Sequence, residues 1–269
     1  MNDHVDLRSR PPAIGVMREC VARHERDQPQ GALARILGVH PLPPDTRSWY
    51  RGALGEIAVA RRLASLGTEW VVIHGVPIGV RGSDIDHLVI GPSGVFTINA
   101  KRHIGARVFA GGGSVKVNGQ PTQYVRNAQY EAERVGKKLS SVMGGPVRVT
   151  PMIVVVGANE VKYGTKRPTV AVLTQGDLPR WMTRQPRALS ADQVARLSEA
   201  SARLSTWGSA LPEGLPDFEV VARFAQIDRD VARAIVRNRV WLLGALVVGA
   251  SVSLVFIAQT LLAIVSSAF

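Results

Sequence analysis

The sequence contains a single cysteine, Cys20, so it can form no internal disulfide and no metal site built from cysteines. That scarcity is typical of proteins in a reducing compartment such as the cytoplasm. The first ten residues are polar and charged, with no apolar stretch behind them. We therefore expect no secretory signal there.

Charged residues are absent from the end of the chain, between Val240 and Phe269. A helix needs about twenty apolar residues to cross the hydrocarbon core of a bilayer. We therefore predict a transmembrane helix over residues 240–265. A buried core helix is the alternative, but globular helices are seldom apolar all round. The basic segment 216–239 precedes the span, so the positive-inside rule predicts a single-pass protein whose N-terminal part faces the cytoplasm.

Acidic residues are few relative to basic ones, with 21 Asp and Glu against 33 Lys and Arg and a formal net charge of +12. Residues 49–158 hold 13 basic and six acidic residues, and so carry +7 of that charge. A basic surface suits a polyanionic partner such as nucleic acid, or an anionic membrane face. Simple solubility is the alternative explanation.

The N-terminal segment, residues 1–48, has only weak helical patterning, with Ile14, Met17 and Val21 at compatible spacing. Three prolines, at positions 41, 43 and 44, then interrupt the chain. We interpret this segment as a partly ordered arm that ends in a proline-rich linker.

Residues 49–215 alternate helical and strand patterns and predict an α/β domain with a mixed sheet flanked by helices. A glycine triplet at 111–113 could cradle a phosphate, but it joins two short strand-like runs and favours a hairpin turn. Residues 159–167 are expected to form a polar loop, and Ser190 and Gln193 form a capping box that starts a helix ending near Trp207. The expected helices are 49–66 and 120–142, and the expected strands are 70–74, 82–91, 94–101, 106–110, 114–117, 147–156 and 169–173.

Within this domain, the hairpin 82–101 concentrates polar residues in an apolar setting. Side chains alternate along a strand, so Asp84 and Asp86 share one face, while Asn99 and Lys101 share a face of the partner strand. Ionised groups beside a core are costly unless they are paired or hold a metal. The hairpin is therefore the candidate functional site.

Residues 52–156 resemble the nuclease-related domain family, NERD, a branch of the restriction-endonuclease-like superfamily. The resemblance is carried by Gly55-Glu56 in the first helix, Ser83-Asp-Ile-Asp-His87, Gly94-Val-Phe-Thr-Ile98, Lys101, and Pro121-Thr-Gln123 before the long helix. It implies a restriction-endonuclease-like fold and metal-dependent cleavage of phosphodiester bonds in nucleic acid, with DNA favoured.

The resemblance also implies roles for individual residues around a Mg²⁺ or Mn²⁺ ion, which prefers oxygen ligands. Asp86 would be the central metal ligand and Glu56 an outer carboxylate. Lys101 would be the catalytic lysine, and Gln123 would orient water or substrate. Asp84, on the same face as Asp86, would be a further ligand, whereas His87 should point the other way and be structural.

Asn99 departs from the superfamily pattern, which has an acid two residues before the lysine. An amide oxygen can contact a metal but brings no charge. This departure supports a second hypothesis, in which the domain is a catalytically inactive module that binds nucleic acid or protein at the membrane. A third hypothesis, independent of Asn99, is a structural anchor with no role in nucleic-acid binding.

Overall fold

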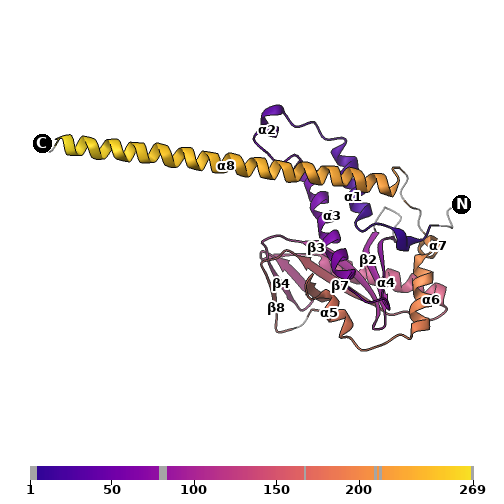
Figure 1. The fold of residues 1–269 in the computed structure, drawn as a ribbon. Coiled ribbons are helices and arrows are strands. Elements are labelled where there is room, and N and C mark those ends of the chain that lie inside the picture. Colours follow the sequence, from indigo (N-terminus) through magenta and orange to yellow (C-terminus); the bar gives the residue numbers. More distant parts are fainter. Residues whose placement is uncertain (1–4, 79–83, 167, 209–210, 212–213, 268–269) are drawn as a thin grey trace.

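The computed structural model describes residues 5–78, 84–166, 168–208, 211 and 214–267. A mixed α/β domain carries one long helix that extends far beyond it (Figure 1). Two residues of the acidic motif, Gly82 and Ser83, lie outside the described residues. The helices are η1 (Leu7–Ser9), α1 (Ile14–His24), α2 (Ala32–Ile36), α3 (Pro44–Leu63), α4 (Tyr124–Met143), α5 (Leu178–Thr183), α6 (Ala191–Ala202), α7 (Leu204–Trp207) and α8 (Asp217–Ser267).

The larger sheet is mixed, with strand order β1-β2-β3-β7-β9. β1, β2 and β3 are antiparallel neighbours, whereas β3, β7 and β9 run parallel. The predicted hairpin is confirmed as β2 and β3, which meet at the Gly91–Gly94 pair, where Gly94 has a φ of +135° that favours glycine. The strands are β1 (Val71–Pro77), β2 (Asp84–Gly91), β3 (Gly94–Arg102), β7 (Val149–Val156) and β9 (Ala171–Thr174).

The smaller sheet has the order β6-β5-β4-β8 and corrects two expectations. Residues 120 and 121, expected to begin the long helix, form β6 instead, and that helix, α4, begins at Tyr124. Residues 159–167, expected to be a polar loop, contain the strand β8, which runs parallel to β4. The backbone of β8 is satisfied by β4 while its polar side chains reach water, so no apolar alternation marks the strand. The strands are β4 (Arg107–Gly111), β5 (Ser114–Val117), β6 (Gln120–Pro121) and β8 (Glu160–Tyr163).

Helices cover both faces of the larger sheet. α3 and α5 bury Val59, Leu63 and Met182 on one face, and α4, α6 and α7 bury Leu139 and Trp207 on the other. The capping box at the start of α6 is confirmed. The chain becomes extended at Arg203, so α6 ends at Ala202, before the position expected from the sequence, and α7 follows it.

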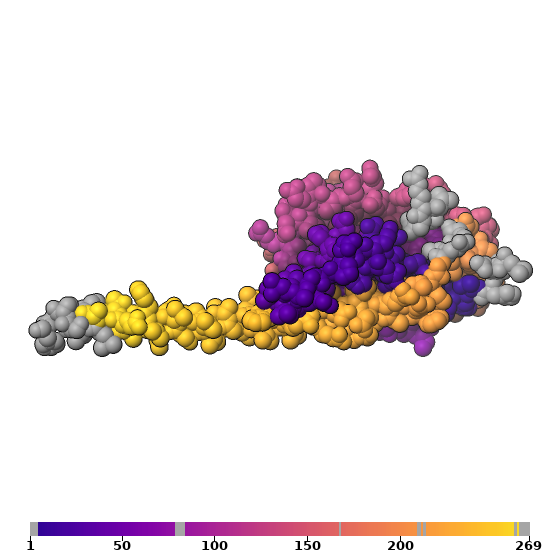
Figure 2. All heavy atoms as spheres, turned by 90° about the horizontal axis from the view of Figure 1, so that it is seen from above, coloured from indigo at the N-terminus to yellow at the C-terminus, as the bar shows by residue number. Residues whose placement is uncertain are grey.

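The N-terminal segment is packed more closely than expected for a partly ordered arm. Ile14, Met17 and Val21 of α1 are buried in a cluster shared with α3 and with Phe224 and Ile227 of α8. The helix expected from Trp49 begins at Pro44, a residue that suits the first position of a helix. Figure 2 shows the N-terminal segment lying against α8. One of the two partners of α1, helix α8, is about two hundred residues away in the chain, so local sequence patterns do not reveal it.

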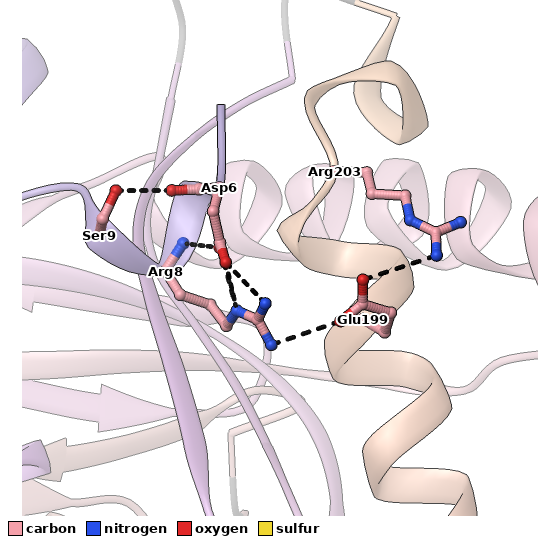
Figure 3. Close-up of polar contacts among 5 residues, drawn as sticks. All are labelled: Asp6, Arg8, Ser9, Glu199 and Arg203. Atoms are coloured by element: carbon pink, nitrogen blue, oxygen red, sulfur yellow. Dashed lines mark hydrogen bonds and ion pairs between the residues drawn. The ribbon is translucent and has the colours of Figure 1, made fainter. Parts of the chain in front are cut away.

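The first described residues are also tied to α6 (Figure 3). Asp6 caps η1 by accepting a hydrogen bond from the backbone N–H of Arg8, at 2.9 Å. Arg8 forms an ion pair with Glu199 at 3.4 Å, and Glu199 forms another with Arg203 at 3.5 Å. Exposed ion pairs stabilise a fold only slightly. These contacts therefore orient η1 relative to α6 but add little to the free energy of unfolding.

α8 is one unbroken helix of 51 residues. Its first half carries arginines and packs on α1 and α3. Its second half is uncharged and exposed, with Val252 at 64% and Phe256 at 69% exposure. Within the described residues, α8 is the helix long and apolar enough to cross a membrane.

Candidate active site at the fork of β2 and β3

The site forms where the β2–β3 ladder ends. The last pair before the strands diverge is His87–Ile98. The point of divergence, which carries Asp86 on β2 and Asn99 and Lys101 on β3, is here called the fork. Beyond the His87–Ile98 pair, Asp86 Oδ2 accepts a hydrogen bond from the backbone N–H of Ala100 at 2.7 Å. The carboxylate of Asp86 therefore takes the place of a backbone carbonyl as the acceptor for this N–H. Burial raises the pKa of Asp86, and the nearby Lys101 together with this hydrogen bond opposes that rise. Asp86 is thereby fixed at the fork and close to a cation.

Lys101 lies on β3, with its Nζ 5.3 Å from the centre of the Tyr124 ring at the start of α4. A cation in this position is attracted by the face of the ring. Lys101 also interacts electrostatically with three carboxylates, those of Glu56, Asp86 and Glu131. Lys101 therefore places a positive charge among these three carboxylates.

Glu56 reaches the site from α3 and is only 6% exposed. Burial raises the pKa of Glu56 well above its ordinary range, and repulsion from Asp86 adds to the effect. The buried stripe of α3 runs through Ala53, Glu56 and Ala60. Ile57, the next residue along the helix, is only half-buried, so the acid takes a core position that an apolar neighbour could have filled.

Asn99 pairs with an acid that the sequence analysis missed. Its Nδ2 donates to both oxygens of Glu131 on α4, at 3.1 and 2.9 Å. Burial raises the pKa of Glu131, the Asn99 amide lowers it, and Asp86 raises it further. Glu131 lies between Ala128 and Val135 on the apolar stripe of α4, and an acid within such a stripe was the available signal.

Asp84 lies at the edge of the site and faces the N-terminal segment. Its Oδ2 is 3.9 Å from a nitrogen of Arg10, whose guanidinium also lies 3.9 Å from Asp217, the first residue of α8. A Cβ added to Gly15 would come within 2.7 Å of the same oxygen, so α1 approaches Asp84 closely. Burial raises the pKa of Asp84 to about 6, against the opposing effect of Arg10.

Two other predicted residues lie away from the carboxylates. Gln123 is exposed at the N-terminus of α4, and among the described contacts its side chain has no hydrogen bond to the site. His87 is fully buried, and its Nδ1 lies 2.8 Å from Nδ1 of His74 on β1. These contacts place His87 in a histidine pair between adjacent strands.

The residues at the fork fit a divalent cation by their chemistry. Asn99 Oδ1 is buried and finds no hydrogen-bond donor in the described part of the chain. The pKa values of the buried Glu56 and of the half-buried Asp86 and Glu131 are raised, so these acids have less positive charge around them than their ionised forms need. Among the described residues, however, no three acidic, histidine or cysteine side chains lie close enough together to hold a metal ion as they stand. A cation would therefore draw the carboxylates together.

Comparisons of the chain with curated proteins and with solved structures gave no match. The match to a protein family covers the segment that contains every residue of the fork, from Glu56 to Glu131. Residues 51–156 match the family model of the nuclease-related domain, NERD.

Proposed function

We propose that this protein is a membrane-anchored, metal-dependent nuclease that hydrolyses phosphodiester bonds of nucleic acid, with DNA as the favoured substrate. The observation that carries the proposal is the position of Lys101 among the buried carboxylates of the fork, inside the segment that matches NERD. The charge of +7 on residues 49–158 supports a polyanionic substrate.

In this proposal Mg²⁺ or Mn²⁺ is held by Asp86 and by Asn99 Oδ1, with Glu56 as an outer carboxylate. Asp84 is a further ligand once Arg10 releases it. When bound, the cation supplies positive charge to phosphate oxygens and makes a bound water a stronger nucleophile. The unpartnered oxygen of Asn99 is the strongest support for a ligand at this position.

The chain's own residues orient and stabilise the reaction. Hydrolysis joins a water oxygen to phosphorus and breaks the bond to the leaving oxygen, which takes up a proton. Lys101 stabilises the negative charge that develops on the phosphate. Tyr124 restricts the position of the ammonium group, and the N–H of Ala100 holds Asp86 in place. Gln123, exposed at the start of α4, contacts substrate at the rim.

Glu131 supplies the negative charge that Asn99 lacks. It holds the Asn99 amide with Nδ2 toward α4, which leaves Oδ1 pointing away from Glu131 and free to bind a cation. We assign Glu131 as a positioning residue. In this way the fork keeps an acid near the place where the superfamily pattern has one, although the acid comes from a different element.

The second candidate function is a catalytically inactive module that binds nucleic acid or protein. Asn99 in place of an acid favours it, because ligand charge contributes strongly to Mg²⁺ affinity. In either case we propose that α8 spans the membrane and holds the domain at the cytoplasmic face. The arginines that precede the uncharged half of α8 support this orientation.

The test is cleavage of labelled single- and double-stranded DNA and RNA by the full-length protein in nanodiscs, with Mg²⁺, Mn²⁺ or a chelator. We expect metal-dependent cleavage that falls by about 10²–10³-fold in Asp86→Asn and Lys101→Met. The matched control is Lys116→Met, on the exposed side of β5, which should cleave normally. Intact substrate under all conditions, with binding that weakens steeply as salt rises, would instead establish the binding module.

A further inference from the structure

Exposed apolar side chains gather on α2 and the residues that follow it. Leu33 is 69% exposed, Ile36 57% and Val39 47%, and Leu37 between them is also exposed. Isolated exposed apolar residues are common on protein surfaces, whereas several on one short segment indicate a contact surface. The segment 32–40, here called the α2 segment, is such a surface.

The α2 segment is fixed to α8 at the place where charge gives way to the uncharged half. The indole Nε1 of Trp241 donates to the carbonyl of Ile36 at 2.8 Å, and Asn238 Nδ2 donates to the carbonyl of Leu37 at 3.4 Å. Gly38 packs so closely that an added Cβ would collide with the backbone of Ala234 and Asn238. Both overall views place α2 beside α8 (Figures 1 and 2).

This attachment sets the level of the α2 segment along α8. The last charged residue of α8 is Arg239, and Trp241 belongs to the first turn of the uncharged half. Tryptophan is enriched where a membrane meets water. A bilayer that surrounds the uncharged half of α8 would therefore have its surface at the level of Ile36 and Leu37.

Positive charge accompanies the apolar side chains. Arg35 and Arg237, with Ala32 and Ile36, line an open hollow of about 490 Å³ between α2 and α8. Arginine binds phosphate through a planar, forked group of donors. At a membrane surface, apolar side chains contact the acyl chains and arginines contact the lipid phosphates. The apolar side chains of the α2 segment and the two neighbouring arginines match these two layers.

We propose that the α2 segment is a second membrane contact, which inserts Leu33, Ile36 and Leu37 into the headgroup region of the bilayer that α8 spans. Arg35 and Arg237 bind the phosphate of an anionic lipid there. The inference rests on the proposed membrane insertion of α8. Amphipathic segments of this kind bury their apolar face about 5–10 Å into the boundary between headgroups and acyl chains. The α2 segment then fixes the orientation of the domain on the membrane.

The test uses the full-length protein with an environment-sensitive fluorophore at single introduced cysteines, in vesicles that contain lipids spin-labelled near the headgroup. The probe positions are Leu37→Cys on the α2 segment, Leu254→Cys in the span, and Val142→Cys, an apolar residue of α4 that is 50% exposed. The native thiol of Cys20 is buried, and its pKa is raised to about 12, so it stays unlabelled.

We expect quenching at position 37 to be several-fold stronger than at position 142. Quenching at 254, measured with lipids labelled deep in the acyl chain, reports insertion of α8 independently. If 254 is quenched but 37 behaves like 142, the inference is wrong while membrane insertion stands. If 254 is not quenched, the membrane proposal itself fails. If position 37 is shielded from water only at a high protein-to-lipid ratio and without quenching, a second copy covers the segment, which also overturns the inference.

Lipid charge tests the role of the arginines. Adding phosphatidylglycerol to phosphatidylcholine vesicles should increase quenching at position 37, and Arg35→Gln with Arg237→Gln should abolish the increase. Lys116→Gln with Lys137→Gln, at exposed positions of β5 and α4, removes the same number of charges and is the matched control that should retain the increase. Inorganic phosphate in solution should not mimic the lipid. An increase that survives in the double variant would remove the arginines from the contact.

Discussion

The fork of β2 and β3 and the outer half of α8 depart from ordinary protein structure in opposite directions. At the fork, the buried Glu56 and the half-buried Asp86 have too little positive charge around them. Along α8, apolar side chains such as Val252 and Phe256 are exposed where a protein in water would bury them. A cation relieves buried negative charge and lipid covers exposed apolar surface, so the two regions suit partners of different chemistry.

The largest effect is expected in α8. Two arginines, Val252→Arg with Phe256→Arg, should each cost about 2.5–3.5 kcal/mol near the centre of a span. We expect the variant to be extracted from membranes by alkaline carbonate, whereas the original protein resists extraction. Val252→Leu with Phe256→Leu is the size-matched control and should stay bound. Retention of the arginine variant in the membrane would contradict a spanning role for α8.

At the fork, a smaller effect should appear as stabilisation by a divalent cation. A ligand at a hundred times its dissociation constant stabilises the folded state by about 3 kcal/mol. Mg²⁺ or Mn²⁺ should raise the melting temperature of the full-length protein at neutral pH, and Asp86→Asn should lose that rise. The same variant should be more stable than the original without metal, because it removes a buried charge. Asp192→Asn, exposed on α6, should leave both results unchanged; an equal rise in Asp86→Asn would exclude Asp86 as a ligand.

Glu131 should show the smallest effect, with a sign that depends on pH. A raised pKa means that the folded state binds the proton more tightly than the unfolded chain, so the stability from this group is lost as pH rises. Glu131→Gln should therefore stabilise the protein at pH 8 by roughly 1 kcal/mol, the low end for a buried and incompletely paired polar group. Below the ordinary pKa of glutamate, about 4.3, the difference should vanish.

The neighbouring Glu133→Gln is the matched control for that experiment. Glu133 is exposed and forms an ion pair with Lys137 at 2.6 Å, which lowers its pKa. Its replacement should therefore shift stability slightly in the opposite direction. The free energies of unfolding of both variants are measured by urea denaturation at pH 4 and pH 8. Destabilisation by Glu131→Gln at pH 8 would show that Glu131 is fully paired in the fold.

Local signals predicted the elements around the fork. The turn between β2 and β3, the apolar run of β7 and the capping box of α6 each depend on neighbours in sequence, and all three are confirmed. The sharing of one face by Asp84 and Asp86 also follows from strand alternation alone. The roles assigned to these residues, and the boundaries of the domain, stay predictions.

Contacts between distant elements were not predictable in the same way. Glu131 meets Asn99 only because α4 folds across β3, and the burial of α1 is completed by α8, which returns to pack on it beside α3. Glu56 was included in the site only through the family resemblance, and Glu131 was missed, although an acid on an apolar stripe is a costly and therefore informative arrangement. Similarly, β8 carries no pattern of its own because it lies at a sheet edge.

The absence of a break in α8 has a consequence for how the proposed nuclease would meet nucleic acid. A flexible linker of n residues has a fluctuating end-to-end distance of about 5–6 Å × √n. A helix holds its two ends at a fixed separation of about 1.5 Å per residue. Because α8 is clamped by α1 and α3 before it becomes apolar, the described residues of α8 give the domain no flexible tether. If α8 spans a membrane and the domain binds nucleic acid, as proposed, the search for nucleic acid is two-dimensional and confined to a thin layer above the lipid. The molecules that the domain meets are then those that come to the membrane.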